Sequence, residues 1–344
     1  MTILSINANY STTRRLSDAK PKIPQSSDTK FERLLLLPQH PQRKGEGGLR
    51  RQGSFKASDS DCGDDSKHPL ITVITVVFNG AATLEKSILS VINQTYDNVE
   101  YIIIDGGSTD GTVDIIRQFE HAIDYWVSEP DGGIYDAWNK ALVCASGSWI
   151  CFMGADDYLW DVNVLSDMVP AMLMAKSSIR IVYGSIAIVN SREQVISHVG
   201  EPWEASKKKL TDIMSVPHPG LMHHRSWFEK YGLFDTSYRI AGDYEMLLRG
   251  WPNEDALFIP GCVVVGMAQG GISSSPENAI KGLSEIRRAQ LSHGILFSNI
   301  RLMTAFINVY IRLGLQTLIG EQKAYRLLDF FRKLFGKAPY WTRL

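Results

Sequence analysis

The chain has few cysteines, little net charge and no hydrophobic run at its start, and each absence excludes a class of protein. The cysteines, at positions 62, 144, 151 and 262, show no close pair and no metal-ligand spacing, so we expect free thiols in a reducing compartment. The opening sequence MTILSINANYSTTRR lacks the basic start and long apolar stretch of a signal peptide. The length of 344 residues fits one large domain with appendages.

The net charge of −1 hides an uneven distribution of charged residues. Residues 69–280 carry 13 basic and 26 acidic side chains, whereas residues 281–344 carry 11 basic and 3 acidic ones. An acidic body argues against nucleic acid as a partner, because nucleic acid binds to positive surfaces. A phosphate-bearing ligand in this body would need a metal ion to offset the repulsion.

The two ends of the chain differ from the middle. Residues 1–68 mix Ser, Asp, Lys and Pro, and their segment GEGGLRRQG (45–53) has too few apolar residues for a core, so we expect a disordered or loosely draped leader. We expect residues 69–280 to form the main folded domain and residues 281–344 to form a basic, amphipathic helical tail.

The tail is strongly apolar from Ile295 to Ile319. Its longest uncharged stretch lies between Arg301 and Arg312 and is too short to span a bilayer. The sequence therefore favours helices that lie on a membrane surface. Helices that pack on the catalytic domain or on a second copy of the chain fit the pattern equally well. We expect a cytoplasmic protein, peripheral on the inner face of the plasma membrane if the tail binds lipid.

Strand-like and helix-like segments alternate in the middle region. Short runs rich in β-branched or aromatic residues occur at 71–78, 99–105, 125–127 and 149–153, and helical patterns separate them. This alternation predicts an α/β fold with a mostly parallel sheet flanked by helices. Ligands of such sheets bind outside the carboxyl ends of the strands, so the residues that follow each run are the candidates for a site.

The adjacent pair Asp156-Asp157, which follows the run at 149–153, is the strongest of these candidates. Two neighbouring carboxylates at a buried strand end repel each other and lose solvation unless a cation or hydrogen-bond donors compensate. A hard divalent cation that also binds substrate phosphates would do so. The alternative is helix capping, in which Asp161 caps the next helix, but capping leaves the adjacent pair unexplained.

Asp105 and the following GGSTDG (106–111) are more ambiguous. The two glycines permit a tight turn, and Asp110 could cap the next helix. The segment lacks the G-x-G-x-x-G pattern of dinucleotide-binding proteins, and it follows the second run instead of the first. A carboxylate fixed at this strand end could accept hydrogen bonds from a base N–H or a ribose hydroxyl.

These segments together carry a resemblance to a known family. ITVITVVFNG, QTYDNVEYIIIDGGSTDGT, EPDGGIYDAWNKAL and FMGADD resemble the family 2 glycosyltransferases of bacterial polysaccharide assembly, as does the later HPGLMHHRSWFEKYGLFDTSYRIAGDYEMLLR. The resemblance covers about residues 70–275. It implies a GT-A nucleotide-diphosphosugar transferase fold and an inverting hexosyltransferase activity.

The resemblance also implies roles for single residues. Donor-nucleotide contacts are expected from Val77, Phe78, Asn79, Asp105, Asp131, Asp136 and Asp156. Asp156 and Asp157 would hold Mn²⁺ or Mg²⁺, although many relatives carry Asp-x-Asp and this chain has Gly154 where the first Asp would stand. Asp243 takes the position of the catalytic base, with Gly242 where Glu is common. Spacing alone indicates that Asp243 is a helix N-cap and that Asp131 lies at the start of a helix.

Three further residues are expected near the acceptor or in a mobile loop. Trp138 stands where relatives usually have Met, His218 matches a position near the acceptor, and Gly271 lies in a Gly-Gly-Ile-Ser segment that suits a loop over the donor or a plain turn. His223 and His224 are adjacent, so on a strand they would face opposite ways instead of sharing a metal.

The mechanism implied is a single displacement. A carboxylate takes the proton of the acceptor hydroxyl while its oxygen attacks the anomeric carbon, and the metal stabilises the departing nucleotide diphosphate. The expected partners are a nucleotide-diphosphosugar donor and a glycan or lipid-linked acceptor. Two alternatives remain open at this point: another nucleotide-sugar enzyme such as a nucleotidyltransferase, and a non-catalytic sugar-binding module on the same fold.

Overall fold

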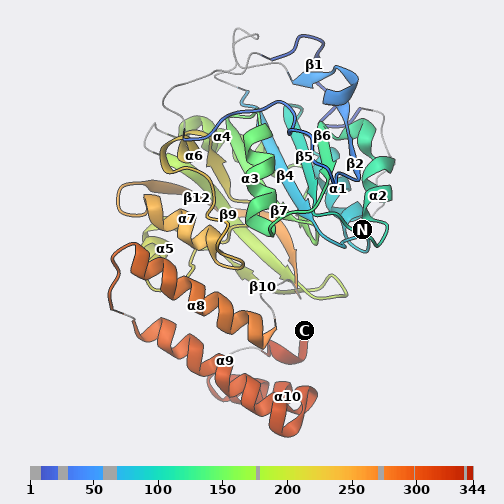
Figure 1. The fold of residues 1–344 in the computed structure, drawn as a ribbon. Helices are drawn as coiled ribbons and strands as arrows, with labels where there is room; N and C mark the ends of the chain where they lie inside the picture. Colours follow the sequence, from blue (N-terminus) through green and yellow to red (C-terminus); the bar gives the residue numbers. More distant parts are fainter. Residues whose placement is uncertain are drawn as a thin grey trace.

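The centre of the fold is a mixed sheet covered by helices on both faces (Figure 1). The structure, a computed structural model, describes residues 9–21, 30–56, 68–175, 179–269, 275–297, 299–336 and 339–343. Within these ranges the sheet has ten strands in the order β2-β6-β5-β4-β7-β11-β9-β12-β8, with β10 paired to β9. The strands are β1 (Leu16–Ser17), β2 (Gly45–Gly47), β3 (Phe55–Lys56), β4 (Ile71–Val77), β5 (Val99–Asp105), β6 (Tyr125–Ser128), β7 (Trp149–Gly154), β8 (Asp157–Leu159), β9 (Ile179–Val189), β10 (Val195–Val199), β11 (Met222–His224) and β12 (Asp255–Ala268).

The parallel core of the predicted sheet is confirmed, but the sheet as a whole is mixed and not mostly parallel, because β2, β8, β10 and β11 pair antiparallel. β4 pairs in parallel with both β5 and β7, and β5 pairs in parallel with β6. These strands are buried on both faces, which explains their near-continuous apolar sequences. The carboxyl ends of all four therefore lie along one edge, where the loops that carry the candidate residues begin.

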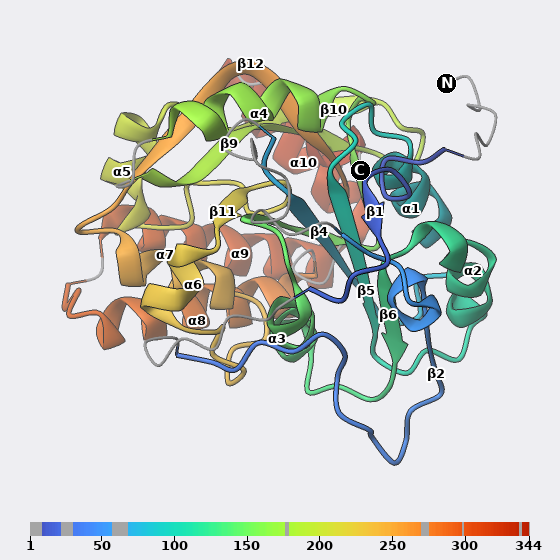
Figure 2. The same cartoon turned by 90° about the horizontal axis from the view of Figure 1, so that it is seen from above.

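Two groups of helices cover opposite faces of the sheet (Figure 2). Side chains of α3, α6, α7 and α8 share one hydrophobic cluster, and those of α1, α2 and α4 share the other. The helices are α1 (Leu84–Ile92), α2 (Thr112–Gln118), α3 (Ile134–Cys144), α4 (Val164–Met174), α5 (Trp203–Leu210), α6 (Ser226–Tyr231), α7 (Gly242–Gly250), α8 (Pro276–Ser292), α9 (Ile300–Ile319) and α10 (Glu321–Leu334), with short 3₁₀ turns η1 (Leu49–Gln52), η3 (Glu120–Ala122) and η4 (Trp341–Arg343).

The N-terminal segment differs from the predicted disordered leader over residues 30–56. β2 adds an antiparallel edge strand to β6, and β1 and β3 pair with each other. Arg50 is buried, forms an ion pair with the buried Glu100, and donates to the Cys144 carbonyl at 2.8 Å. Backbone pairing and a buried ion pair hold this segment, so its lack of apolar residues did not prevent order.

The C-terminal region also differs from the predicted division. The expected boundary at 280/281 falls inside α8, which packs on α7 as part of the catalytic domain. α9 runs unbroken through Arg312, so its 20 residues, with a mean hydropathy of 1.4, are long and apolar enough to cross a membrane. The prediction counted only the uncharged stretch between Arg301 and Arg312, and it therefore underestimated the apolar length of this helix. Length and composition alone do not establish a membrane span.

Candidate active site

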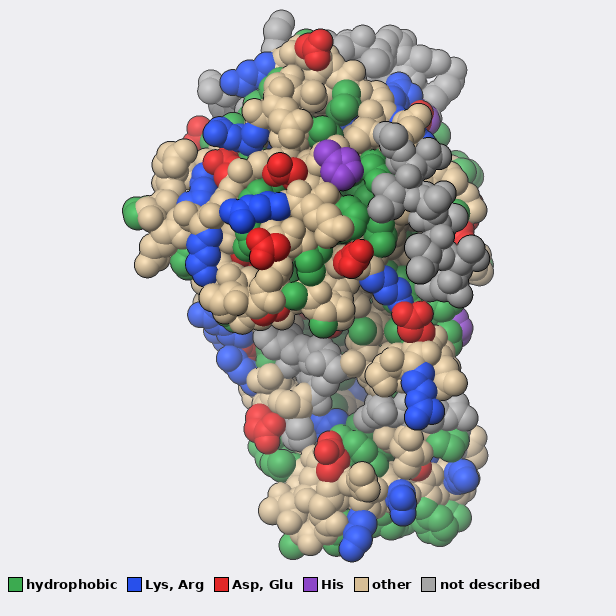
Figure 3. Space-filling model, turned by 90° about the vertical axis from the view of Figure 1, so that its right-hand side faces the viewer, with side chains coloured by type: hydrophobic (Ala, Val, Ile, Leu, Met, Phe, Trp, Pro, Cys, Tyr) green, Lys and Arg blue, Asp and Glu red, His purple; other side chains and the backbone are tan. Residues whose placement is uncertain are grey.

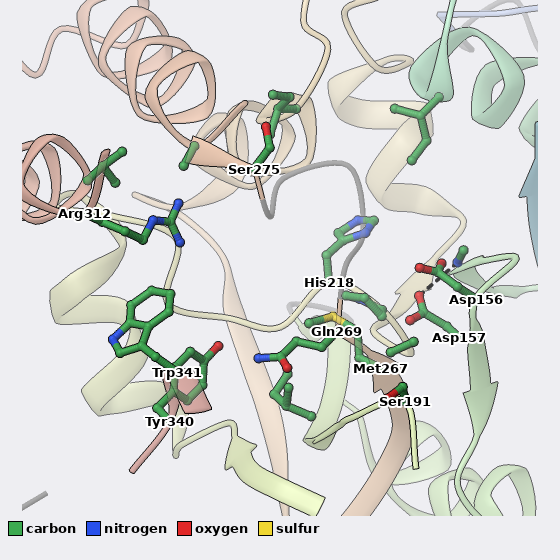
Figure 4. Close-up of a pocket in the computed structure, with 18 of the residues that line it drawn as sticks. Asp156, Asp157, Ser191, His218, Met267, Gln269, Ser275, Arg312, Tyr340 and Trp341 are labelled. Atoms are coloured by element: carbon green, nitrogen blue, oxygen red, sulfur yellow. Dashed lines mark hydrogen bonds between the residues drawn. The ribbon is translucent and has the colours of Figure 1, made fainter. Parts of the chain in front are cut away.

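A cavity of ≈ 1330 Å³ lies beside the carboxyl end of β7 (Figure 4). Its lining includes five of the predicted site residues, which come from α3, the β7–β8 turn, the loop before β11, and α7: Trp138, Asp156, Asp157, His218 and Asp243. The other predicted residues whose positions the structure describes lie outside the lining of this cavity: Val77, Phe78, Asn79, Asp105, Asp131 and Asp136. Gly271 lies outside the described residues.

The acidic pair sits at the turn between β7 and β8. Asp157 is 6% exposed, and its Oδ2 accepts the Gly154 N–H at 3.0 Å. Burial and the charge of Asp156 raise the pKa of Asp157 to about 8, although the hydrogen bond from Gly154 opposes the shift. Burial is the larger cause of the shift, and a cation between the two carboxylates would compensate both the lost solvation and their mutual repulsion.

The crowding around Gly154 gives a structural reason for the departure from Asp-x-Asp at this position. A Cβ on Gly154 would lie 2.8 Å from Oδ1 of Asp156 and 3.1 Å from Oδ2 of Asp157. The missing side chain therefore leaves space beside both carboxylates, and these oxygens suit a hard divalent cation. No cluster of three or more His, Cys, Asp or Glu side chains with metal-site geometry occurs in the described ranges. The pair could thus supply part of a coordination shell that substrate oxygens complete.

Asp243 occupies the first turn of α7, on another side of the cavity. Its Oδ1 accepts hydrogen bonds from the Tyr135 hydroxyl at 3.3 Å and from the Tyr244 N–H at 2.8 Å. Burial and the negative charge of Asp243 raise the pKa of Tyr135 well above its ordinary value, so the phenol stays protonated and remains a donor. Asp243 is not the N-cap of this helix, because that position belongs to Ala241.

Tyr135 also explains the second departure from the family pattern. A Cβ on Gly242 would lie 2.7 Å from the Tyr135 ring. Glu at position 242 would therefore collide with this ring, and the tyrosine hydroxyl instead contacts the neighbouring Asp243. Sequence reasoning missed Tyr135, although it stands in the quoted motif EPDGGIYDAWNK, because only the fold brings α3 against α7.

A second missed residue, Glu285 of α8, holds the start of α7. Its buried carboxylate accepts the backbone N–H groups of Arg239, Ile240 and Ala241 at 3.0, 2.8 and 2.9 Å. These three residues directly precede α7, whose N-cap is Ala241, so the Glu285 carboxylate fixes the segment that leads into the helix. The position of Asp243 consequently depends on α8.

The residues predicted for the nucleotide lie at the ends of β4, β5 and β6. Phe78 is 68% exposed. A Cβ on Gly106 would lie 2.6 Å from Oδ2 of Asp131 and 3.4 Å from the Phe78 ring, so these two side chains flank the glycine. Burial raises the pKa of Asp131, while the Gly133 N–H opposes the shift by donating to its Oδ1 at 2.8 Å. The exposed ring can stack on a base, and the neighbouring carboxylate can accept a hydrogen bond from that base.

Asp105 lies at the carboxyl end of β5, as predicted. It is fully buried, and its carboxylate accepts hydrogen bonds from the N–H groups of Gly107 and Ser108 at 3.1 and 3.0 Å, and from the hydroxyls of Ser108 and Ser128. These hydrogen bonds show that Asp105 shapes the turn after β5, and its contact with a nucleotide stays a prediction.

Three other predicted nucleotide residues also have structural contacts. Val77 is buried at the end of β4. The Asn79 side chain accepts the Thr109 N–H at 2.9 Å. Asp136 accepts the Gly132 N–H at 2.9 Å at the start of α3.

His218 and Trp138 form part of an aromatic wall of the cavity. Their ring centroids lie 5.0 Å apart, and neither the His218 Nε2 nor the Trp138 Nε1 has a hydrogen-bond partner within the described structure. Burial lowers the pKa of His218, although the charge of Asp243 opposes this shift, so the neutral ring is favoured. The neighbours His223 and His224 differ as predicted, since the first is fully buried and the second is half-buried.

Comparison with known proteins places this geometry in a family. The family described as "Glycosyl transferase family 2" matches residues 72–232. An uncharacterized glycosyltransferase of Mycobacterium tuberculosis is 34% identical over 183 residues, which are 53% of this chain and 68% of that protein. The chain belongs to glycosyl transferase family 2. The present chain is also 28% identical to a PGL/p-HBAD biosynthesis glycosyltransferase of Mycobacterium bovis. The matched residues make up 54% of this chain and 71% of that protein.

Solved structures confirm the GT-A fold. Staphylococcus aureus TarS, residues 1–349, aligns with a TM-score of 0.52 at 17% identity, covering 74% of this chain and 77% of that one. The mannosyltransferase PcManGT of Pyrobaculum calidifontis, solved with GDP-Man and Mn²⁺, aligns with a TM-score of 0.52 at 18% identity, covering 82% and 84%. At these identities the likeness establishes the fold and no more.

Proposed function

We propose that this glycosyltransferase moves a hexosyl group from a nucleotide-diphosphosugar to an acceptor hydroxyl by a metal-assisted, inverting displacement. One observation carries the proposal: Asp156, Asp157 and Asp243 reach a single cavity from two separate elements. A metal-binding acidic pair and a separate carboxylate are the groups that such a displacement requires. Two solved structures with this fold support the same ligand class, since PcManGT is in complex with GDP-Man and Mn²⁺ and TarS is in complex with UDP-GlcNAc.

Asp156 and Asp157 would hold Mn²⁺ or Mg²⁺ beside Gly154. The cation would supply a Lewis acid for the leaving diphosphate. The raised pKa of Asp157 is what an acidic pair should show when it is built to receive a cation, because each carboxylate then depends on that cation for compensation. Phe78 and Asp131, which lie at the strand ends beyond this cavity, would contact the base or ribose.

Asp243 would act as the general base. Tyr135 and the Tyr244 N–H engage its Oδ1, and no hydrogen bond to its Oδ2 occurs among the described residues. One oxygen is thus oriented by donors while the other can accept the acceptor proton. Direct attack by the deprotonated hydroxyl inverts the anomeric carbon and needs no covalent enzyme intermediate.

We further propose that the enzyme works at the cytoplasmic face of a membrane on a glycan or lipid-linked acceptor. The helices α9 and α10 expose large apolar side chains, among them Ile307, Ile311 and Phe331, and carry basic residues beside them (Figure 3). Such a surface suits an anionic membrane. Cosedimentation with anionic vesicles should be lost when residues 295–344 are deleted, and retention by the truncated protein would contradict this proposal.

Donor turnover tests the proposed reaction. Purified protein would be given UDP-, GDP- and dTDP-sugars with Mn²⁺, Mg²⁺ or EDTA, and released nucleotide diphosphate would be measured. We expect cleavage of one donor, only with metal, and an inverted anomer in the first product seen by ¹H NMR. If no donor binds in a thermal-shift assay, the assignment of the acidic pair is wrong, and a non-catalytic module becomes the better account.

A further inference from the structure

The wall of the cavity opposite the acidic pair comes from the C-terminal helices. Arg312 of α9, Tyr325 and Arg326 of α10, and Tyr340 and Trp341 at η4 all line the cavity that contains Asp156 and Asp243 (Figure 4). This wall lies outside residues 72–232, which match the family.

Arg312 is held in place without an ion pair. Its guanidinium carbon lies 5.0 Å from the centroid of the Trp341 ring, and Trp341 in turn stacks on Tyr325 with centroids 5.7 Å apart. A guanidinium above a ring keeps its in-plane N–H groups for other partners. The Nε of Arg312 is buried without a hydrogen bond, and in the described ranges no carboxylate pairs with Arg312 or Arg326.

The aromatic part of this wall is fixed by Asp329 of α10. Its carboxylate accepts the N–H groups of Tyr340 at 2.8 Å, Trp341 at 3.0 Å and Thr342 at 2.7 Å. Burial would raise the pKa of Asp329, but hydrogen bonds from Thr342 and these N–H groups hold it below its ordinary value. The chain end is thus anchored beside the cavity, and Trp341 and Arg312 are preorganised.

Gln269 presents unsatisfied polar atoms to the same cavity. It follows β12, and its amide nitrogen and amide oxygen are both buried without hydrogen-bond partners among the described residues. In Figure 4 it lies between the aromatic pair Tyr340–Trp341 and the residues His218 and Met267. Buried donors and acceptors without partners are costly in a folded protein, so their gathering around one cavity indicates a polar ligand.

We propose that the C-terminal helices supply the acceptor subsite, and that the acceptor carries a phosphate ester next to the sugar that receives the hexosyl group. Arg312, held by the Trp341 ring, binds the phosphate together with Arg326, and Gln269 bonds sugar hydroxyls. This inference rests on the proposed function, since it requires that the cavity hold an acceptor.

The chemistry of the wall favours phosphate. Arginine matches phosphate through paired N–H donors. Glu321 also lines this wall, but among the described residues neither Arg312 nor Arg326 forms an ion pair, so both can pair with an anionic group that an uncharged glycan lacks. The same helices expose Ile311 and Phe331 on the outside, so an apolar chain attached to the phosphate could follow them toward a membrane. A soluble sugar phosphate would share the recognition of the phosphate but not that of the chain.

Calorimetric titration of the full chain, without donor, tests the subsite. The probes are octyl glucosyl phosphate, octyl glucoside and glucose 1-phosphate below micellar concentration. The variants are Arg312→Gln, Arg312→Lys and the matched control Arg301→Gln, which removes an arginine of the same helix outside the cavity. Melting temperatures verify that each variant folds.

We expect the wild type to bind octyl glucosyl phosphate at least tenfold more tightly than octyl glucoside. Arg312→Gln should lose this preference, Arg312→Lys should recover part of it, and Arg301→Gln should keep it. Tighter binding of octyl glucosyl phosphate than of glucose 1-phosphate would identify a lipid-linked acceptor. Equal binding of these two probes would identify a soluble acceptor. Absence of any phosphate preference, or its survival in Arg312→Gln, would overturn the proposal. Because no donor is present, failure here is distinct from failure of donor cleavage.

Discussion

Substitution of Gly154 by Ala should disable the metal site while leaving the fold intact. The added Cβ would lie 2.8 Å from Asp156 Oδ1 and 3.1 Å from Asp157 Oδ2, both closer than an ordinary van der Waals contact. Asp157 cannot turn away freely, since it is buried and bonded to the Gly154 N–H. Overpacking of this size costs about 1–3 kcal/mol. A shift of the carboxylates by about 1 Å would lower activity roughly a hundredfold.

The assay compares Mn²⁺-dependent donor cleavage with Mn²⁺ affinity measured by calorimetry. Gly154 does not have a positive φ, so alanine adds no backbone strain there. Gly314→Ala in α9 is the matched control, because a Cβ there meets nothing within 4 Å and alanine should stabilise the helix by up to about 1 kcal/mol. Full activity and unchanged Mn²⁺ affinity in Gly154→Ala would refute the assignment of Asp156 and Asp157 as metal ligands.

Three further predictions concern the base and the acidic pair. Tyr135→Phe keeps the ring against Gly242 but removes a donor to Asp243, so kcat should fall about tenfold with little change in melting temperature; unchanged kcat would show that the contact is incidental. Glu285→Gln leaves fewer acceptor sites for three backbone N–H groups and should cost about 1.5–3 kcal/mol in urea unfolding and lower kcat as well. In metal-free protein, the folded pKa of Asp157, about 8 against an ordinary 3.8, means that the folded state keeps a proton that the unfolded state releases. Its stabilising contribution is therefore full below pH 3.8 and is lost as the pH rises toward 8, and Asp157→Asn should remove this part of the pH dependence measured by urea unfolding.

The parallel core was predictable because its signals are local. The runs at 71–78, 99–105, 125–127 and 149–153 correspond to β4, β5, β6 and β7, since strands buried on both faces need continuous apolar sequence. The order of residues 30–56 was not predictable in this way. Its stability comes from backbone pairing with β6 and from the ion pair of Arg50 with Glu100, and neither leaves a periodic signal in the segment itself.

The candidate site was predictable only in part, for a similar reason. Asp156, Asp157 and Asp243 stood out through motifs, and the fold brings them to one cavity. The four hydrogen bonds that Asp105 accepts from nearby donors could not be predicted from the sequence. Glu285 acts through contacts between elements more than 40 residues apart. Such pairings depend on tertiary structure and leave no mark in local sequence.

The central claim is that the acidic pair binds the donor and Asp243 performs the transfer. The most direct test measures donor binding and donor cleavage in parallel for wild type, Asp157→Asn and Asp243→Asn, with Mn²⁺ and the donor that the wild type cleaves. We expect Asp157→Asn to lose metal-dependent binding and cleavage together, and Asp243→Asn to bind the donor normally while cleavage falls by a factor of roughly 100 or more. Normal cleavage by Asp243→Asn, or metal-dependent binding retained in Asp157→Asn, would contradict this account.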